Sequence, residues 1–468
     1  MSSRRSSTLL PESSTPPASS TPPGSNVERD ATPRRVLGLA LPTLGVLAAE
    51  PLYLLFDAAV VGRLGAAALA GLAVGGLVLA QVSTQLTFLS YGTTARAARM
   101  HGADRDEDAV GEGVQATWLA FGLGAAIVAV MQVLCVPILT LIGGGGDITS
   151  DAVSWFRVAV LGVPFILVSM AGNGWMRGVQ DTARPLRYVV AGLGLSAVLC
   201  PLLVHGLAGF PDLGLVGSAV ANVAGQTVSG AFFVAALLRS GVARGPSWSV
   251  MRAQLLLGRD LVLRSLAFQA CFLSAAAVAS RFGAASVAAN QVVLHLWNLV
   301  SLTLDSLAIA AQTLVGAALG RSDVRGATRL GWRLTVWSTV FALLLAGAFA
   351  IGRPVVPALF TTDPAVIDQM YSIWWIFVVI IPIAGVVFAL DGVLLGAGDA
   401  AFLRTATLAC ALLGFLPAIW LALAFDWGLR GIWFGLGSFV TLRMIAVIGR
   451  TLSGRWALAG ADIQRTAE

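Results

Sequence analysis

The sequence contains no lysine, and charged residues make up only 12% of its 468 positions. All 30 basic residues are therefore arginines, set against 24 acidic residues and three histidines. Soluble domains carry about 25% charged residues. Hydrophobic residues reach 57% here, and the mean hydropathy is +0.83. This balance excludes an ordinary soluble domain and indicates an integral membrane protein.

Cysteine and histidine are also scarce, which excludes several kinds of site. The cysteines lie singly in apolar runs, so neither a disulfide framework nor a zinc site is indicated. The histidines do not cluster, and no metal or other cofactor is expected. There is no GxxxxGK[ST] motif to bind ATP, and no nucleophile constellation to support an enzyme.

Long apolar segments recur along the whole chain, each near the 20 or so residues that a spanning helix needs. A β-barrel would instead show weakly alternating segments of about 10 residues. We therefore expect an all-α integral membrane fold. Twelve spans are predicted, over residues 36–62, 67–92, 111–137, 152–176, 186–206, 213–238, 255–280, 285–316, 328–352, 366–394, 402–424 and 429–451.

Most arginines fall in the loops on one side of these spans. The five on the other side are Arg63, Arg157, Arg281, Arg353 and Arg430. The positive-inside rule then places both termini in the cytoplasm of a multi-pass protein of the cell (inner or plasma) membrane. Because the basic excess is explained as a topogenic signal, no nucleic-acid partner is expected. Residues 1–33 are rich in Ser, Thr and Pro, and are predicted to be a disordered cytoplasmic tail.

The chain matches itself when it is shifted by 218 residues. VGRLGAAALA aligns with ASRFGAASVA, and the same offset gives the pairs Gly102/Gly320, Pro164/Pro382, Gly174/Gly392, Gly178/Gly396 and Asp181/Asp399. This repeat predicts two parallel six-helix lobes related by a pseudo-two-fold axis along the membrane normal. We expect an N-lobe over 34–240, a C-lobe over 241–452 and a cytoplasmic tail over 453–468. Transporters commonly bind substrate between such repeats.

Features present in both repeats are predicted to be structural. Asp181 and Asp399 each precede a helix at a predicted cytoplasmic turn, so both are interpreted as N-caps. The Arg-Leu-Gly and Arg-Phe-Gly sequences, near Gly65 and Gly283, are interpreted as turns that end the first and seventh spans.

Two acids in the first span have no counterpart in the second repeat. Glu50 and Asp57 lie seven residues apart in AEPLYLLFDAAVVGRLG, about 10 Å along one helix face. Acids inside a membrane are functional by default. A carboxyl group that is neutral when enclosed and loses its proton when it meets water can couple transport to a proton gradient. We therefore predict proton coupling at Asp57 and Glu50; the alternative is a structural acid bonded to a neighbouring helix.

Further polar and helix-bending residues accompany these acids in the N-lobe. Pro42 and Pro51 each remove a backbone donor from the first span and favour a bend. Asn173, in the fourth span, is expected either to bond to Asp57 or to clasp a neighbouring helix. Gln85 and Asn222 complete the predicted N-lobe polar network.

The C-lobe contains its own intramembrane acids. Asp391 is the repeat partner of Asn173, whereas Asp305 is unmatched. Either acid could bind a cation or a proton, and either could be a satisfied interior acid. Gln269 and Asn290 are the predicted neighbours of Asp391.

Three stretches together resemble the MATE (multidrug and toxic compound extrusion) family in its DinF-like branch. They are LALPTLGVLAAEPLYLLFDAAVVGRLGAAALAGLAV, RGVQDTARPL and SLTLDSLAIAAQTLVGAALG, and the resemblance covers residues 32–452. It implies a V-shaped pair of six-helix lobes. It also implies antiport that expels organic, often cationic or amphipathic compounds in exchange for H⁺ or Na⁺. The partners would be small organic substrates and membrane lipids, and a monomer is expected.

The resemblance also implies roles for individual residues. Asp57 matches the protonation site of the first span, Pro42 matches the bending proline, and Asn173 matches an asparagine of the same polar network. Some relatives carry a second acid where this chain has Arg177. Asp391 lies where other branches place part of a sodium site, but no acidic partner is evident on span 7. H⁺ is therefore favoured over Na⁺ as the coupling ion.

Several alternatives remain beside a proton-coupled exporter. A sodium-coupled MATE exporter and a lipid-linked precursor flippase belong to the same superfamily. The flippase class usually has more spans and an arginine-rich cavity, whereas the interior here is predicted to be nearly free of arginine. A membrane-embedded enzyme lacks a supporting constellation. A channel is disfavoured because a 6+6 repeat with lone acids is typical of alternating access.

Overall fold

The computed structural model describes residues 32–461 except residue 243, and all regular structure within that range is helical. The predicted disordered tail therefore lies almost wholly outside the described residues. Twelve helical segments are long and apolar enough to cross a membrane, and each overlaps one predicted span. The all-α, twelve-span prediction is confirmed.

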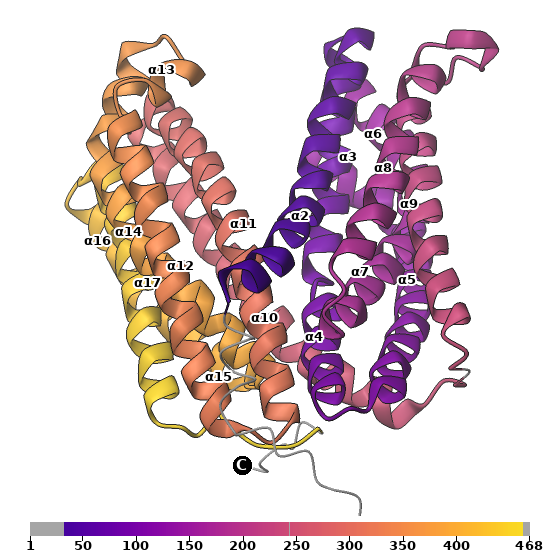
Figure 1. Cartoon of the computed structure of the whole chain (residues 1–468). Coiled ribbons are helices and arrows are strands. Elements are labelled where there is room, and N and C mark those ends of the chain that lie inside the picture. The colour runs from indigo at the N-terminus through magenta and orange to yellow at the C-terminus, as the bar shows by residue number, and fades with distance from the viewer. Residues whose placement is uncertain (1–31, 243, 462–468) are drawn as a thin grey trace, which may run out of the picture.

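The helices form two bundles that diverge like the arms of a V (Figure 1). The first bundle, here called the N-lobe, comprises α2 (Pro33–Val61), η1 (Gly62–Leu64), α3 (Ala66–Gln85), α4 (Phe88–Gly102), α5 (Asp106–Gly143), α6 (Asp147–Ala159), η2 (Val160–Gly162), α7 (Val163–Gly178), α8 (Ala183–Val204), η3 (Leu207–Gly209) and α9 (Gly214–Arg239). The second bundle, the C-lobe, comprises α10 (Trp248–Ala279), η4 (Ser280–Phe282), α11 (Ala284–Gly320), α12 (Val324–Gly352), α13 (Val356–Phe360), α14 (Pro364–Gly396), α15 (Ala400–Cys410), η5 (Ala411–Phe415), α16 (Leu416–Ala424) and α17 (Gly428–Leu452).

The two lobes meet where α4 packs against α11, and the glycines of the repeat make this close approach possible. A β-carbon added at Gly102 would overlap the carbonyl oxygen of Ala317, and one added at Gly320 would overlap that of Arg99. The two contacts are equivalent in the repeat, because the 218-residue offset relates Gly102 to Gly320 and Arg99 to Ala317. Only glycine allows backbones to approach so closely. The pseudo-two-fold relation predicted from the sequence therefore appears in the packing itself.

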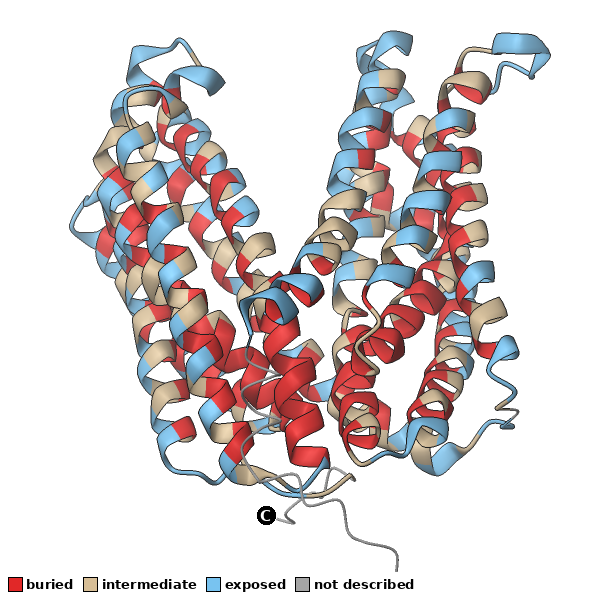
Figure 2. Ribbon diagram, in the orientation of Figure 1, coloured by how far each residue is buried: buried red, intermediate tan, exposed pale blue. Residues whose placement is uncertain are grey.

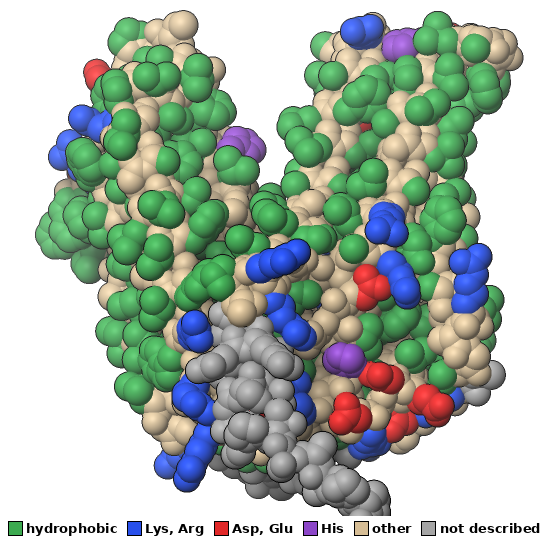
Figure 3. Space-filling model, in the orientation of Figure 1, with side chains coloured by type: hydrophobic (Ala, Val, Ile, Leu, Met, Phe, Trp, Pro, Cys, Tyr) green, Lys and Arg blue, Asp and Glu red, His purple; other side chains and the backbone are tan. Residues whose placement is uncertain are grey.

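Burial is concentrated at this junction, at the end of the molecule that carries the C-terminus (Figure 2). In α11, every residue from Ala308 to Gly320 is buried, and in α14 every residue from Ala389 to Gly396 is buried. Hydrophobic side chains cover the arms of the V, whereas most visible acidic side chains and many arginines lie toward the same end (Figure 3). The arms therefore present apolar surface to a bilayer, and the closed end is the polar one.

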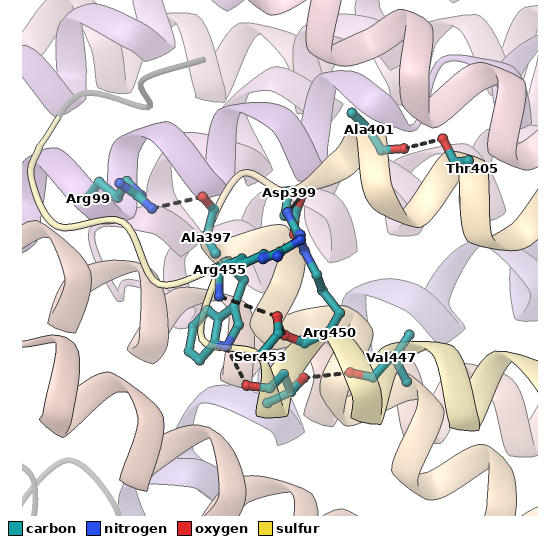
Figure 4. Close-up of polar contacts among 11 residues, drawn as sticks. Arg99, Ala397, Asp399, Ala401, Thr405, Val447, Arg450, Ser453 and Arg455 are labelled. Carbon is teal, nitrogen blue, oxygen red and sulfur yellow. Dashed lines mark hydrogen bonds and ion pairs between the residues drawn. The ribbon is translucent and has the colours of Figure 1, made fainter. Parts of the chain in front are cut away.

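The described part of the predicted C-terminal tail is docked at this junction. Trp456 is buried, and the backbone N–H of Gly460 donates to Leu319 of α11 at 3.0 Å. Arg99 of α4 donates to the carbonyl oxygens of Ala397 at 2.8 Å and Gly460 at 3.1 Å (Figure 4 shows the first of these bonds). A cation is favourable at a helix C-terminus, here that of α14. One buried arginine of the N-lobe thus ties together two segments of the C-lobe.

The two turn aspartates have different roles. Asp181 precedes Thr182, the N-cap residue of α8, and accepts a hydrogen bond from the backbone N–H of Arg184 at 3.1 Å, so it caps the first turn of α8 from one position before the N-cap. Asp399 makes no such bond; its carboxylate instead binds Arg450 of α17 at 2.7 Å (Figure 4). A charge-assisted bond to arginine is stronger than a bond to a backbone amide. Asp399 therefore occupies the predicted N-cap position of α15, but its side chain binds an arginine and does not cap the helix.

Candidate functional site

Asp57 lies near the end of α2 with its side chain inside the N-lobe, where the residue is only 2% exposed. The Cys200 thiol of α8 donates to Oδ1 at 3.1 Å, and the Ser218 hydroxyl of α9 donates to Oδ2 at 2.9 Å. Within the described part of the chain, no arginine or histidine pairs with this carboxylate. Neutral donors alone hold the carboxyl group.

Tyr53 extends this polar site by one helical turn. It lies four residues before Asp57, so both side chains lie on one face of α2. The hydroxyl of Tyr53 accepts a hydrogen bond from Ser196 of α8 at 2.7 Å, and the amide of Asn222 of α9 lies beside it. Of the three residues predicted for the N-lobe polar network, Asn222 therefore joins the site.

The packing of α8 against α9 explains how these groups come together. A β-carbon added at Gly192 would lie 2.5 Å from the carbonyl oxygen of Gly225, and one added at Gly225 would lie 2.5 Å from the carbonyl oxygen of Gly192. The two backbones are thus in direct contact, which brings Cys200 and Ser218 to the same side of Asp57. The indole N–H of Trp155 donates to the Ser218 hydroxyl at 3.2 Å and orients it.

The other predicted members of the N-lobe site lie apart from it. Asn173 is buried on α7, but its Oδ1 has no hydrogen-bond partner among the described residues, and both oxygens of Asp57 are bonded elsewhere. The predicted bond between Asn173 and Asp57 is therefore wrong. Gln85 has an unpartnered Oε1 as well. Glu50 is exposed, although it lies on the same helix as the buried Asp57.

Helix α2 contains both Pro42 and Pro51, and Figure 1 shows it bending toward the C-lobe. Pro42 lacks the N–H that would bond to the carbonyl oxygen of Gly38. That oxygen instead accepts a hydrogen bond from the Thr182 hydroxyl, at 3.3 Å, in the turn between α7 and α8. Because α2 packs on α8 of the N-lobe and on α11 of the C-lobe, a change in its bend would reach both lobes.

In the C-lobe, Asp391 of α14 is bonded to two arginines. Its Oδ2 accepts from Arg264 of α10 at 2.6 Å and from Arg443 of α17 at 2.5 Å. Two guanidinium groups already neutralise the carboxylate, so this arrangement does not offer the anionic oxygen cage that a metal cation needs. The expectation that Asp391 binds a cation in the C-lobe is not supported by its partners.

The predicted neighbours of Asp391 lie elsewhere. The amide of Gln269 donates across the lobes to Gln81 of α3 at 2.7 Å. Asn290 accepts a hydrogen bond from the indole N–H of Trp433 at 3.2 Å and forms a clasp inside the C-lobe. Neither amide bonds to Asp391, whose hydrogen-bond partners among the described residues are the two arginines.

The interior also contains more arginine than the sequence predicted. Arg99, Arg177 and Arg443 are buried, and Arg264 lines a cavity. Arg99 and Arg177 fall in predicted loops, where arginine is expected, whereas Arg264 and Arg443 fall inside the predicted spans 255–280 and 429–451 but were counted with the arginines of the cytoplasmic side. The prediction of a nearly arginine-free interior is wrong, and with it the main reason for setting the flippase alternative aside.

A cavity of about 220 Å³ lies between α4, α10, α11 and α14. Arg264, Asp305 and Asp391 line it, so the two acids predicted for the C-lobe do share a site. The Tyr91 hydroxyl of α4 donates to Oδ2 of Asp305 at 2.6 Å.

Several residues of both sites were not predicted from the sequence. Tyr53 and Tyr91 could have been found, because each is a polar aromatic within a span and Tyr53 lies one turn from Asp57. Cys200 and Ser218 are small residues common in packed helices. Nothing in their local sequence distinguishes them, and only the tertiary contact of α8 with α9 gives them a role.

The MatE family model matches the chain twice, over residues 42–202 and 261–420. The two matches are one repeat length apart, and together they span well over half of the chain.

The chain belongs to the MATE family.

Its relatives place this MATE protein in the DinF-like branch. DNA damage-inducible protein F of Escherichia coli (strain K12) is 31% identical over 431 residues, covering 89% of this chain and 90% of that protein. Protein DETOXIFICATION 44, chloroplastic, of Arabidopsis thaliana is 30% identical over 449 residues, covering 90% and 83%. The probable multidrug resistance protein NorM of Thermotoga maritima is 25% identical over 442 residues, covering 90% and 93%. The chain is thus a transporter and not an enzyme.

Solved MATE structures share the fold. A crystal structure of MATE in the bent conformation superposes with a TM-score of 0.83 at 23% identity, covering 92% of this chain and 97% of the other. A crystal structure of MATE in the straight conformation gives a TM-score of 0.77 at the same identity and coverage. The predicted pair of six-helix lobes agrees with this architecture.

Proposed function

We propose that this MATE protein exports organic compounds in exchange for protons by alternating access. The observation that carries the proposal is the buried carboxyl group of Asp57, whose hydrogen-bond donors in the described part of the chain are a thiol and a hydroxyl. A carboxylate enclosed without a cation is costly, and a bound proton removes that cost. When the site meets water, the charged form is solvated and the proton can leave.

The distribution of charge supports an orientation with the closed end in the cytoplasm. The arms of the V diverge away from the end that carries the C-terminus (Figure 1). With the termini in the cytoplasm of a cell membrane, as the arginine bias indicates, the structure represents an outward-open state. In that state Asp57 takes up a proton from outside, and it releases the proton to the cytoplasm after the lobes have rocked.

Helix α2 is suited to link protonation to movement. It carries Asp57 in its second half, and its first half bends at Pro42, where the Thr182 hydroxyl satisfies the freed carbonyl oxygen. Protonation of Asp57 weakens the hydrogen bonds that link α2 to α8 through Cys200 and to α9 through Ser218. A helix that contacts both lobes then transmits the change to the substrate path.

The surroundings of the two acids favour H⁺ over Na⁺ as the coupling ion. A sodium ion, like other hard cations, prefers several oxygen ligands. Asp57 offers a carboxylate beside a thiol and one hydroxyl, and Asp391 is bonded to two arginines. Proton binding at Asp57 needs no further ligand.

The substrates proposed are small organic compounds, often cationic or amphipathic, carried by a monomer in contact with membrane lipids. The relatives named for multidrug resistance support this class. A lipid-linked precursor flippase is the second candidate. Arg264 at the cavity wall favours it, because guanidinium groups bind anionic head groups.

Efflux of a fluorescent organic cation from proteoliposomes under an imposed pH gradient tests the proposal. Asp57→Asn should abolish gradient-driven efflux. The proposal leaves out Glu50, which was predicted to share the coupling role, because this acid is exposed and lies outside the hydrogen bonds that hold Asp57. Glu50→Gln therefore serves as the matched control and should retain most of the activity. Unchanged efflux in Asp57→Asn, or efflux driven by a sodium gradient alone, would contradict proton coupling at Asp57. Translocation of a labelled lipid-linked phosphate without dye efflux would support the flippase.

A further inference from the structure

A short hydrogen bond joins the two lobes at the floor of the V. Tyr91 lies on α4 of the N-lobe and Asp305 on α11 of the C-lobe, and the phenol donates to the carboxylate at 2.6 Å. Gln312 of α11 reinforces the contact by donating to the carbonyl oxygen of Tyr91 at 2.7 Å. These bonds must break whenever the lobes separate at the end that carries the C-terminus.

The same cavity holds polar atoms that have no protein partner among the described residues. Gln312 is only 1% exposed and Asp391 only 6%, and Oε1 of the former and Oδ1 of the latter are unpartnered. Nε of Arg264 is unpartnered too. Buried polar groups usually have partners. A cavity of about 220 Å³ with such a lining has room for the water that a proton path needs.

The charged and titratable groups that act on Asp305 come from four helices. They are Tyr91 of α4, Arg177 of α7, Arg264 of α10 and Asp391 of α14. Arg264 is bonded to Asp391, so its charge is shared with another acid. Arg177 makes its described hydrogen bond to Ser90 at 3.4 Å rather than to Asp305. Among the residues that the structure describes, Asp305 therefore has one direct donor, and that donor belongs to the opposite lobe.

We propose that Asp305 and Tyr91 form a second proton-binding site, at which proton uptake loosens the junction between the lobes. The ionised carboxylate of Asp305 binds the Tyr91 phenol strongly, because hydrogen bonds to charged acceptors are about twice as strong as neutral ones. A proton added to that carboxylate weakens the bond and removes the charge that would be left without a donor after separation. The proton thus lowers the cost of opening this end.

This site differs from that of Asp57 in position and in consequence. Asp57 lies wholly within the N-lobe, whereas Asp305 lies at the interface between the lobes and bonds to a residue of the opposite lobe. The inference rests on the proposed alternating-access cycle, but its test measures a distance and requires no transport.

The test is double electron–electron resonance on the full chain in lipid nanodiscs between pH 5 and pH 8. Spin labels are placed at Glu107→Cys in α5 and Arg325→Cys in α12, which are both exposed and start their helices on the closed side. The native cysteines are replaced, with Cys200→Ser to keep a donor for Asp57. The wild-type background should gain a longer-distance population as the pH falls.

Asp305→Asn, which mimics the protonated acid, should show the longer distances at every pH. The ratio of long to short populations at pH 8 should rise about tenfold, as expected for the loss of one hydrogen bond to a charged group. Tyr91→Phe removes the donor alone and should raise the same population at pH 8; it decides the test if Asp305→Asn does not fold.

Asp57→Asn separates this site from the proposed function. A pH-dependent distance that persists in Asp57→Asn and is lost in Asp305→Asn supports the second site, even if neither variant transports. Distances that match the wild type in both Tyr91→Phe and Asp305→Asn would overturn it. So would a pH response lost in Asp57→Asn and unchanged in Asp305→Asn.

Discussion

In the N-lobe, Asp57 accepts hydrogen bonds from a thiol and a hydroxyl, whereas Asp391 in the C-lobe accepts from two guanidinium groups. Both carboxyl groups are almost completely buried. Their partners differ in charge, and this difference determines what each can do. Asp391 forms ion pairs with Arg264 and Arg443 and serves as the counter-charge of both. Among the described residues Asp57 has no cationic partner, and this is the basis of our proposal that it alternates between its charged and neutral forms.

The repeat makes this divergence clearer. Asp391 corresponds to Asn173, an uncharged residue at the matching position of the N-lobe. The glycines Gly102 and Gly320, at which the lobes approach each other, are kept in both halves, but the acids inside the membrane are not. Duplication thus preserved the packing of the lobes while the interior charges were placed independently in each.

The largest predicted effect is the difference in stability between two single variants, Asp391→Asn in the C-lobe and Asp57→Asn in the N-lobe. Asp391→Asn leaves two arginines without their carboxylate, and breaking a buried ion pair costs about 3–5 kcal/mol. Asp57→Asn leaves no charge behind and should change the stability little. Thermal melting of the purified variants in one detergent would measure this. Equal melting temperatures for the two variants would remove the distinction between the acids.

A smaller effect is predicted for the donors of Asp57. Ser218→Ala removes one hydrogen bond to the ionised form, worth about 1.5–3 kcal/mol, so the proton should leave only at higher pH. The pH of half-maximal efflux should therefore rise by about one unit or more. Cys200→Ser keeps a donor at the other oxygen and is the matched control. A shift to lower pH in Ser218→Ala would contradict the assigned geometry.

The smallest effect is expected at the bend of α2. Thr182→Val removes the hydroxyl that satisfies Gly38, at a cost of about 1 kcal/mol, and should slow efflux a few-fold without abolishing it. Thr227→Val is the control, because that hydroxyl bonds only to Val223 of its own helix. Initial efflux rates would show the difference. An equal loss in both variants would mean that the bend has no special role.

The fold could be predicted from the sequence because its evidence is repeated along the chain. Apolar length marks the spans, and the 218-residue offset marks the lobes. The sites were predicted less completely. Asp57 stood out as an acid in an apolar run, but Cys200 and Ser218 acquire their roles only through the contact of α8 with α9. Arg264 and Arg443 lie inside predicted spans but were counted with the cytoplasmic arginines, because the local sequence does not show whether an arginine of a span points inward.

Infrared difference spectroscopy on the purified protein tests the central claim most directly, because it observes the carboxyl group itself. A pH step from 8 to 5 should produce the C=O band of a protonated carboxylic acid in the wild type. Part of that band should be lost in Asp57→Asn. A band of full intensity in Asp57→Asn would show that Asp57 does not take up the proton, and would contradict the account.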